Sequence, residues 1–495
     1  MPLQKRVETK QPLSPAAPST VATRSRPSRN RTPRFVNDVH SQLNRTRVSA
    51  IHQPDSIEAL QRVIRKARAR TQAVSIAGGR HAMGGQQFGT NTLLLDMSRM
   101  NRVLGFCPLR QEVEVEAGIQ WPELINYLIE AQRGSSVQWG VIQKQTGADR
   151  LSLGGALAAN IHGRGLNLKP IIDDVEAFVL VDAEGQAHKC SRQENNELFR
   201  LAIGGYGLFG VVAHVTLRLQ PRRKLERVVR VADLRDLAAS FEERIRSGFL
   251  YGDFQFMTDG DSDGFLRRGI FSCYRPAPPA APLPPSHREL SPDDWKRLLH
   301  LAHTDRKRAF EVYSSHYLAT DGQLYWSDTH QLSVYLDDYH RELDERLGAR
   351  GSEMITEVYV PREQLAAFME TTRADFRAHH AELIYGTIRL IEKDDESFLA
   401  WAGKPYACVV FNLHVEHTPA GIEKAKEDFR RLIERAIEHH GNFYLTYHRW
   451  ATREQVLSCY PQIIEFLRLK RKYDPAETFQ SDWYRHYKAM FSDEI

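Results

Sequence analysis

Long apolar runs and paired cysteines are both missing from this chain of 495 residues. No stretch reaches the length of an apolar helix that spans a membrane, so the sequence predicts no transmembrane segment. The cysteines are scattered without a CxxC pair, at Cys107, Cys190, Cys273, Cys408 and Cys459. This pattern argues against a disulfide framework and a structural zinc site, so we predict no metal and expect a reducing, cytoplasmic setting.

Acidic residues are nearly absent from residues 1–34, where eight Lys or Arg stand against the single acid Glu8. This segment accounts for the whole net charge of +5, so no nucleic-acid partner is expected for the remainder. Its other residues are mostly Pro, Ser, Thr and Ala, which bury too little surface to offset the entropy of ordering. It also lacks the apolar core of a secretory signal, so we predict a disordered basic tail.

The rest of the chain has the composition of a soluble globular protein, since 42% of the sequence is hydrophobic and 26% is charged. Its length is enough for two or three domains. A helix is predicted from Ile57, with Asp55 or Ser56 as its N-cap, because apolar residues then recur at helical spacing. Strands are predicted at 93–96 and 113–116, and a helix at 121–130.

The stretch from Val74 to Asp96 places a glycine-rich loop between two short apolar strands. Glycines at 78, 79, 84 and 85 allow the backbone to turn through positive φ and to point N–H groups at an anion such as a pyrophosphate. The loop also carries one histidine, His81. A plain hairpin turn is the alternative interpretation.

Two further glycine clusters follow. Residues 151–163, LSLGGALAANIHG, leave room for a flat ligand or for a tight helix contact. Residues 204–210, GGYGLFG, contain GxGxxG, but the alternating run VVAHVTLRL follows where a dinucleotide-binding Rossmann unit needs a helix. We therefore reject a Rossmann fold.

The order and spacing of these clusters resemble the FAD-binding domain of vanillyl-alcohol-oxidase or p-cresol-methylhydroxylase (PCMH) type flavoproteins. The matching segments are IAGGRHAMGG, LLLDMSRMNRV, VEVEAGIQWPEL, SLGGALAANIHGRG, VEAFVLVDAEGQ and NELFRLAIGGYGLFGVVAHVTLRL. The segment LKRKYDPAETFQSDWYRHY near the C-terminus is similar to the closing segment of the alditol, sugar-lactone and decaprenylphosphoryl-ribose oxidase branch.

The resemblance implies an α+β, two-domain flavoprotein. A PCMH-type FAD-binding domain would occupy residues 35–221. A substrate-binding (cap) domain with an antiparallel sheet and flanking helices would occupy 222–453, and residues 454–495 would return to the FAD domain.

The resemblance also implies which residues contact FAD. Those around the pyrophosphate would be Ala77, Gly78, Gly79, Arg80, His81, Ala82 and Met83. Those along the isoalloxazine and ribityl chain would be Gly118, Gly147, Ser152, Gly154, Gly155 and His162, with Gly210 and Val212 on the adenine side. His81 stands where many relatives link the flavin covalently, since a neutral imidazole can attack the ring methyl; a hydrogen bond alone is the alternative. No cysteine for a second link occurs in residues 146–150.

The second region is less informative. The six prolines of residues 275–285 predict an extended surface loop. Residues 259–264 imitate the start of an EF-hand loop, but Ile270 stands where a bidentate Glu is required, so a hairpin turn is predicted.

Three strands with a polar face are predicted at 385–391, 411–416 and 443–450. The first places Tyr385, Thr387 and Arg389 on one face. The third places Tyr447 on one face and His448 on the other. Such a face is also what the solvated side of an antiparallel sheet presents.

The resemblance implies an FAD-linked oxidase or dehydrogenase. It would take a hydride from a CH–OH group of a sugar, alditol, lactone or related alcohol onto flavin N5, and oxygen or another acceptor would reoxidise the flavin. We expect Tyr447 or His448 to act as the base and Arg389 to hold an anion or the flavin carbonyl region. The sequence differs from these relatives at two positions, so the identity of the substrate stays undetermined. Thr387 replaces the Glu of a sugar-alcohol-oxidase Glu-x-Arg pair, and Tyr447 replaces a lysine of decaprenylphosphoryl-ribose oxidases.

Two alternatives stay open. One is a reductase of the sterol-side-chain type that uses NADPH. The other is a non-catalytic flavin-binding protein whose basic tail binds nucleic acid or an acidic partner. The sequence carries no indication of oligomeric state.

Overall fold

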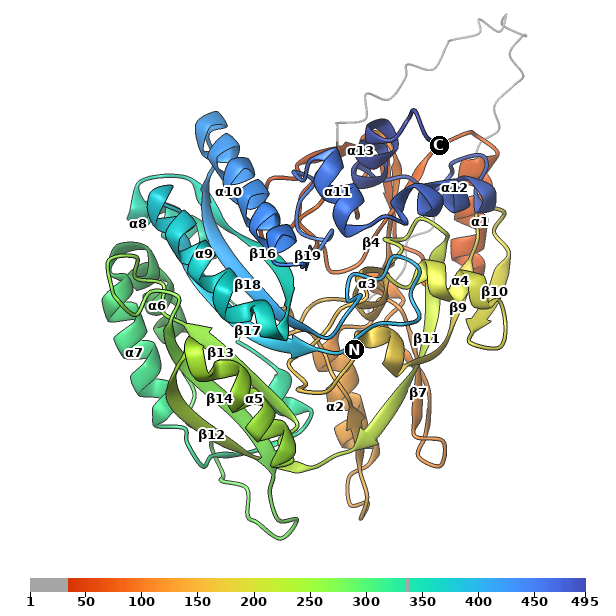
Figure 1. The fold of residues 1–495 in the computed structure, drawn as a ribbon. Helices are drawn as coiled ribbons and strands as arrows, with labels where there is room; N and C mark the ends of the chain where they lie inside the picture. The colour runs from red at the N-terminus through yellow and green to blue at the C-terminus, as the bar shows by residue number, and fades with distance from the viewer. Residues whose placement is uncertain (1–33, 335, 337–338) are drawn as a thin grey trace, which may run out of the picture. The chain divides into compact units, whose positions relative to one another are not determined.

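The computed structural model describes residues 34–334, 336 and 339–495. Apart from Arg34, the predicted basic tail lies outside the described residues. Arg34–Ile495 form one compact unit, drawn in Figure 1. Within the described part of the chain, no helix combines the length and the apolar character needed to cross a membrane.

A small parallel sheet opens the fold. Its order is β3 (Ala50–His52), β5 (Leu93–Asp96) and β4 (Val74–Ala77), and α1 (Ile57–Arg68) connects β3 to β4. The Ser56 side chain accepts a hydrogen bond from the backbone N–H of Ala59, which caps α1. Leu60, Ile64 and Ala67 are its buried face. The predicted helix and strand are confirmed. A separate pair is formed by β1 (Arg34–Val36) and β2 (Thr46–Val48).

A second sheet is antiparallel. Its order is β10 (Ala187–Ser191), β9 (Val175–Val181), β11 (Val211–Pro221), β7 (Glu112–Glu116) and β6 (Val103–Cys107), and β8 (Trp139–Val141) also pairs with β11. The helices of this part are α2 (Trp121–Ala131), α3 (Leu153–Ala159) and α4 (Asn196–Ala202). The GxGxxG segment runs directly into β11, which confirms that it is not a Rossmann motif.

The largest sheet has eight strands, all antiparallel to their neighbours. Their order is β15 (Leu324–Trp326), β12 (Lys224–Asp233), β14 (Arg268–Pro276), β13 (Tyr251–Phe256), β17 (Leu383–Ile391), β18 (Tyr406–Glu416), β16 (Gly351–Pro361) and β19 (Asn442–Phe443). The turn of residues 259–264 joins β13 to β14, so the predicted hairpin is confirmed. The predicted α+β class with an antiparallel sheet and flanking helices is also confirmed.

The two faces of this sheet have different neighbours. Three helices, α5 (Leu237–Arg246), α9 (Leu365–Ala378) and α10 (Pro419–Glu438), lie across one face (Figure 1). There Phe411 of β18 meets Phe368 and Phe376 of α9, with ring centroids 6.4 and 5.4 Å apart. Alternate residues of β18, including Val410 and Asn412, point to the opposite face and line a cavity. The helices α6 (Pro292–Thr304), α7 (Arg306–Leu318) and α8 (Tyr339–Leu347) contribute residues near that side.

The predicted strand at 443–450 is wrong. Only Asn442–Phe443 pair with β16, and the following residues form turns. The reason is that the backbone beyond Phe443 bonds to the glycine loop instead of to a strand: the Thr446 carbonyl accepts from the Gly84 N–H at 3.1 Å. The alternation of aromatic and polar residues here belongs to a segment that runs from the eight-stranded sheet to the glycine loop.

The C-terminal helices are α11 (Arg453–Cys459), α12 (Ile463–Tyr473) and α13 (Asp482–Met490). Between α12 and α13 the chain adds to the free edge of β4. The Val74 N–H donates to the Thr478 carbonyl at 2.7 Å, and the Gln480 N–H donates to the Val74 carbonyl at 2.8 Å. Phe479 thereby forms a parallel bridge with Val74.

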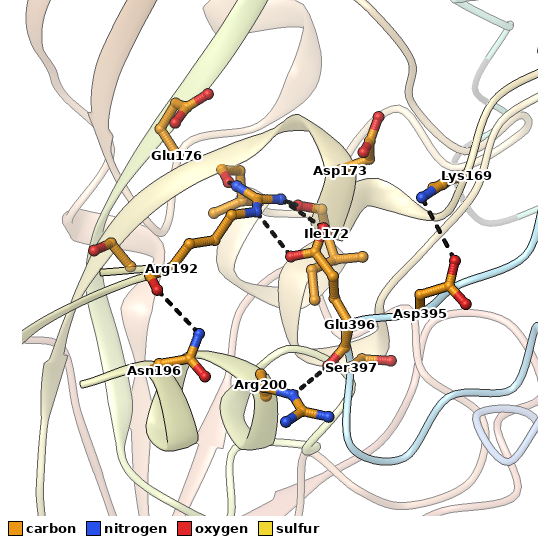
Figure 2. Close-up of polar contacts among 12 residues, drawn as sticks. Lys169, Ile172, Asp173, Glu176, Arg192, Asn196, Arg200, Asp395, Glu396 and Ser397 are labelled. Carbon is orange, nitrogen blue, oxygen red and sulfur yellow. Dashed lines mark hydrogen bonds and ion pairs between the residues drawn. The ribbon is translucent and has the colours of Figure 1, made fainter. Parts of the chain in front are cut away.

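The loop between β17 and β18 ties the eight-stranded sheet to the first half of the chain (Figure 2). Arg192 donates from Nε and Nη2 to the two carboxylate oxygens of Glu396, at 2.8 and 3.1 Å. Arg200 donates to the Glu396 carbonyl, and Lys169 lies 3.8 Å from Asp395. A buried bond from Asn160 Nδ2 to Asp394 Oδ2, 2.8 Å, continues the contact.

Candidate active site

One cavity of about 960 Å³ extends between the glycine loops and the eight-stranded sheet. All but two of the predicted cofactor residues line it: Gly78, Gly79, Arg80, His81, Ala82, Met83, Gly147, Ser152, Gly154, Gly155, His162, Gly210 and Val212. The structure therefore brings three stretches that are far apart in sequence to one surface.

The first glycine loop is packed closely against the second. A Cβ on Gly78 would lie 1.9 Å from Ser152 Oγ, and one on Gly79 would lie 2.3 Å from the Arg150 carbonyl oxygen. Real atoms do not approach so closely, so only glycine permits this contact. The two loops form a continuous wall of the cavity.

Ala77 and Gly118 are the two exceptions, and their contact with the cofactor stays a prediction. Ala77 ends β4 and is buried with Phe88 and Leu94. Gly118 is held inside the fold, where a Cβ would lie 2.0 Å from the Met97 carbonyl oxygen. Both residues support the cavity wall from behind.

His81 lines the cavity beside a second histidine. Its Nδ1 lies 2.8 Å from Nε2 of His40, and the two ring centroids are 4.8 Å apart. Burial, with the charge of His40 as a smaller cause, lowers the pKa of His81 to about 3. The imidazole is therefore neutral at physiological pH.

The cavity wall fits a dinucleotide-sized ligand that carries hydrogen-bond donors. Gly147 has a φ of +83°, and a Cβ there would meet nothing within 4 Å. The side-chain oxygens of Gln86 and Gln87 have no hydrogen-bond partner within the described residues, although both side chains line the cavity. A wall of glycines with buried polar atoms that need partners suits a bound cofactor.

Opposite the glycine loops, a buried carboxylate organises a polar centre. Glu357 of β16 accepts from Tyr447 Oη at Oε1, 2.8 Å, and from Tyr359 Oη at Oε2, 2.9 Å. Nε2 of His162 lies 3.0 Å from the same Oε2. Burial opposes ionisation, but His162, Arg389 and the Tyr447 hydroxyl together lower the pKa of Glu357 to about 2. The carboxylate is ionised at neutral pH.

Arg389 faces the same space. Its side chain is buried in β17 and lines the cavity, as predicted for that strand, and its Nε has no hydrogen-bond partner among the described residues. Thr387, two residues before it, is buried and is not part of the lining. A buried guanidinium with an unused donor is suited to hold an anionic or carbonyl group of a ligand.

Tyr447 and His448 are separated by the structure. Tyr447 lines the cavity, whereas His448 does not. The His448 ring stacks on Phe429, with centroids 4.7 Å apart, and its Nε2 lies 3.2 Å from Thr356 Oγ1. Burial lowers the pKa of His448 to about 3. Of the two residues predicted as the base, the structure places only Tyr447 at the cavity, because the His448 ring lies in the core.

Glu357 is the main residue that sequence reasoning missed. It lies in β16, GSEMITEVYVP, where two glutamates four residues apart interrupt a buried strand. A charged residue in such a strand is rarely fully buried without partners, so the two glutamates could have indicated a buried polar site. Its partners come from distant segments that no local pattern connects.

Comparison with known proteins agrees with this geometry. A family described as FAD binding domain matches residues 48–191. An uncharacterised oxidoreductase of the fasciation locus of Rhodococcoides fascians is 27% identical over 231 residues, 46% of this chain and 51% of that protein. L-gulonolactone oxidase of Bos taurus is 27% identical over 195 residues, 39% and 42% of the two chains. L-galactono-1,4-lactone dehydrogenase 1 of Oryza sativa, a mitochondrial protein, is 30% identical over 194 residues, 38% and 32%.

The chain thus spans about half or less of the length of these relatives. The matched part holds the first two glycine loops and most of the cavity wall that faces the sheet. Residues 48–191 therefore belong to an FAD-binding domain that is similar to those of the FAD-linked oxidases and dehydrogenases, and the cofactor is FAD.

Proposed function

We propose that this protein is an FAD-dependent oxidoreductase that oxidises a CH–OH group of a sugar, alditol, lactone or related alcohol. The observation that carries the proposal is the polar centre of Glu357, Tyr447 and Arg389, which faces the FAD-binding loops across one cavity. Relatives over the matched part are named as lactone oxidases and dehydrogenases, which supports this substrate class.

Each residue of the centre has a distinct task in this proposal. Bound FAD supplies the acceptor for the hydride that leaves the substrate carbon. The Tyr447 hydroxyl already donates to Glu357. A substrate hydroxyl that donates to the Tyr447 oxygen can thus pass its proton to the phenol while the phenol proton moves onto Glu357, which then releases it because its pKa is far below neutral pH. Arg389 holds the negative charge that develops on the substrate oxygen, or a carbonyl of the flavin.

Contacts to FAD are assigned to the cavity-lining residues of the glycine loops. We propose that the loop from Gly78 to Met83 holds the pyrophosphate and that His81 bonds covalently to the flavin. The neutral state of this imidazole supports a nucleophilic role. We also propose the domain limits 35–221, 222–453 and 454–495, and a reducing, cytoplasmic setting; the latter is supported by five unpaired cysteines.

The test is anaerobic flavin reduction. Purified holoprotein is mixed with a panel of sugars, alditols and aldonolactones, and the loss of oxidised-flavin absorbance is followed. Tyr447→Phe should slow reduction by the best substrate by about 10²- to 10⁴-fold, the usual contribution of a proton acceptor. Tyr406→Phe is the matched control, because Tyr406 is a buried tyrosine outside the cavity lining.

Three results would oppose the proposal. Bleaching by NADPH alone would favour the reductase alternative. The absence of bleaching by any compound would favour a non-catalytic flavin protein. Equal rates for Tyr447→Phe and the wild type would remove Tyr447 from the proton path.

A further inference from the structure

A second buried polar cluster lies on the cavity-facing side of the eight-stranded sheet, and the proposed reaction does not use it. Glu353 of β16 and His414 of β18 stand directly opposite each other in the register of the two strands. His303, near the end of α6, and His340 of α8 complete the cluster. Their side chains are 2–9% exposed, so all four are removed from solvent.

The ligand atoms of His303, Glu353 and His414 lie within 4.8 Å of one another, close enough to surround one ion. His303 Nε2 lies 3.0 Å from Glu353 Oε1, and His414 Nδ1 lies 3.6 Å from the same oxygen. The second distance is too long for a hydrogen bond, and His414 Nδ1 has no hydrogen-bond partner among the described residues. A tetrahedral zinc with bonds of about 2.0–2.1 Å separates its ligand atoms by about 3.3–3.4 Å. The two observed separations fall on either side of this value.

The donor set also has the right chemistry. Two imidazole nitrogens and a carboxylate oxygen are typical ligands of divalent zinc and its first-row neighbours. The other oxygen of Glu353 accepts from Tyr339 Oη at 2.8 Å, and His340 Nδ1 lies 3.6 Å from it. Metal-bound carboxylates are commonly oriented by such outer hydrogen bonds.

We propose that His303, Glu353 and His414 bind a divalent transition-metal ion of the zinc class, with the fourth position taken by water. Glu353 lies four residues before Glu357 on one strand, which corresponds to about 13 Å. The ion is thus too far from the polar centre to act on a substrate there, and its role is structural.

The ion would fasten the helical wall of the cavity to the sheet. His303 comes directly after Ala302, and His340 directly after Tyr339, and both preceding residues line the cavity. No spacing motif marks these ligands in the sequence, because they come from separate helices and strands.

The test uses the full-length protein. The metal content of purified and chelator-treated protein is measured by mass spectrometry, and the treated protein is titrated with Zn²⁺ and then with Co²⁺, whose visible absorption reports tetrahedral nitrogen and oxygen ligation. We expect one tightly bound ion per chain. Glu353→Gln and His414→Asn should weaken Zn²⁺ binding by more than the ~10- to 100-fold that loss of an outer-shell partner causes.

His417→Gln is the matched control, since His417 contacts Ser352 Oγ at 2.9 Å and not Glu353. Zn²⁺ should raise the melting temperature of the wild type and of this control, and should leave that of Glu353→Gln unchanged. If a variant fails to fold, the cobalt spectrum of the wild type still shows whether the protein binds a metal ion at a tetrahedral site. Wild-type protein that binds neither ion, or Glu353→Gln that binds as well as the wild type, would overturn the site and leave a hydrogen-bonded His–Glu cluster. Neither outcome changes the result expected for flavin reduction, so the metal site and the proposed function are tested separately.

Discussion

His81 and His40 form a contact of 2.8 Å between ring nitrogens, and this contact affects how His81 can react with the flavin. With Nδ1 of His81 directed at His40, the state of one ring fixes which nitrogen of the other carries the proton. Such a pair holds the His81 ring in one orientation. An imidazole that attacks the flavin must have its ring held so that one unprotonated nitrogen faces the flavin.

Replacing His81 by Ala is expected to abolish covalent flavin. After acid denaturation, the yellow colour should stay in the pellet of the wild type and move to the supernatant of the variant. His188→Gln serves as the control, because His188 pairs with Asp182 and lies outside the cavity lining. Colour in the wild-type supernatant would show that FAD binds without a covalent bond.

Asp174 is expected to make the stability of the protein depend on pH. Burial raises its pKa to about 7 from an ordinary value of 3.8, and its Oδ2 has no hydrogen-bond partner in the described part of the chain. The folded state then binds more protons than the unfolded state between these values. The free energy of unfolding should therefore fall as the pH rises from about 4 to about 7.

Urea unfolding of the wild type and of Asp174→Asn at pH 5 and pH 8 checks this expectation. The variant should lose most of the dependence and be more stable than the wild type at pH 8, by at most about 4 kcal/mol. Parallel pH profiles for the two proteins would contradict it.

The connection from β7 to α2 depends on a glycine that contacts backbone on two sides. The Gly118 N–H donates to the Met100 carbonyl at 2.7 Å, and the space of its missing Cβ is filled by the Met97 carbonyl. Gly118→Ala should therefore destabilise the protein by about 1–3 kcal/mol through overpacking.

Gly105→Ala in β6 is the matched substitution, since a Cβ there meets nothing within 4 Å. It should leave stability unchanged or raise it by up to about 1 kcal/mol. Thermal unfolding of both variants separates the steric effect from a general effect of the Gly→Ala change. Equal melting temperatures would mean that the loop moves to admit the methyl group.

Sequence patterns predicted those elements whose partners are local. The α1 cap at Ser56, the β11 strand and the hairpin at 259–264 follow from residues within one turn or one strand. The segment 443–450 failed because its hydrogen bonds go to Gly84 and Gln86, far away in the chain. Glu357 was missed for the same reason, since the side chains that stabilise its ionised form, His162 and Arg389, lie in other elements.

The whole fold is closed by the return of the chain to β4. Phe479 is 1% exposed and packs with Val74 and Leu60 in one hydrophobic cluster. Phe479→Ala should lower the free energy of unfolding by about 3–5 kcal/mol, because it leaves a cavity in that cluster.

Leu109→Ala is the control for this change. Leu109 is 94% exposed, so its truncation should alter stability by less than about 0.5 kcal/mol. Urea unfolding followed by far-UV circular dichroism measures both. A small effect of Phe479→Ala would show that the return segment is dispensable for the fold.

The pairing of Thr478–Gln480 with Val74 also sets an order of events at the ribosome. Domains usually fold from the N-terminal side as the chain emerges. Here β4, which leads into the glycine loop, keeps an open edge until nearly all of the described chain has been translated. Nascent chains that stall before this point would expose that edge to pairing with one another.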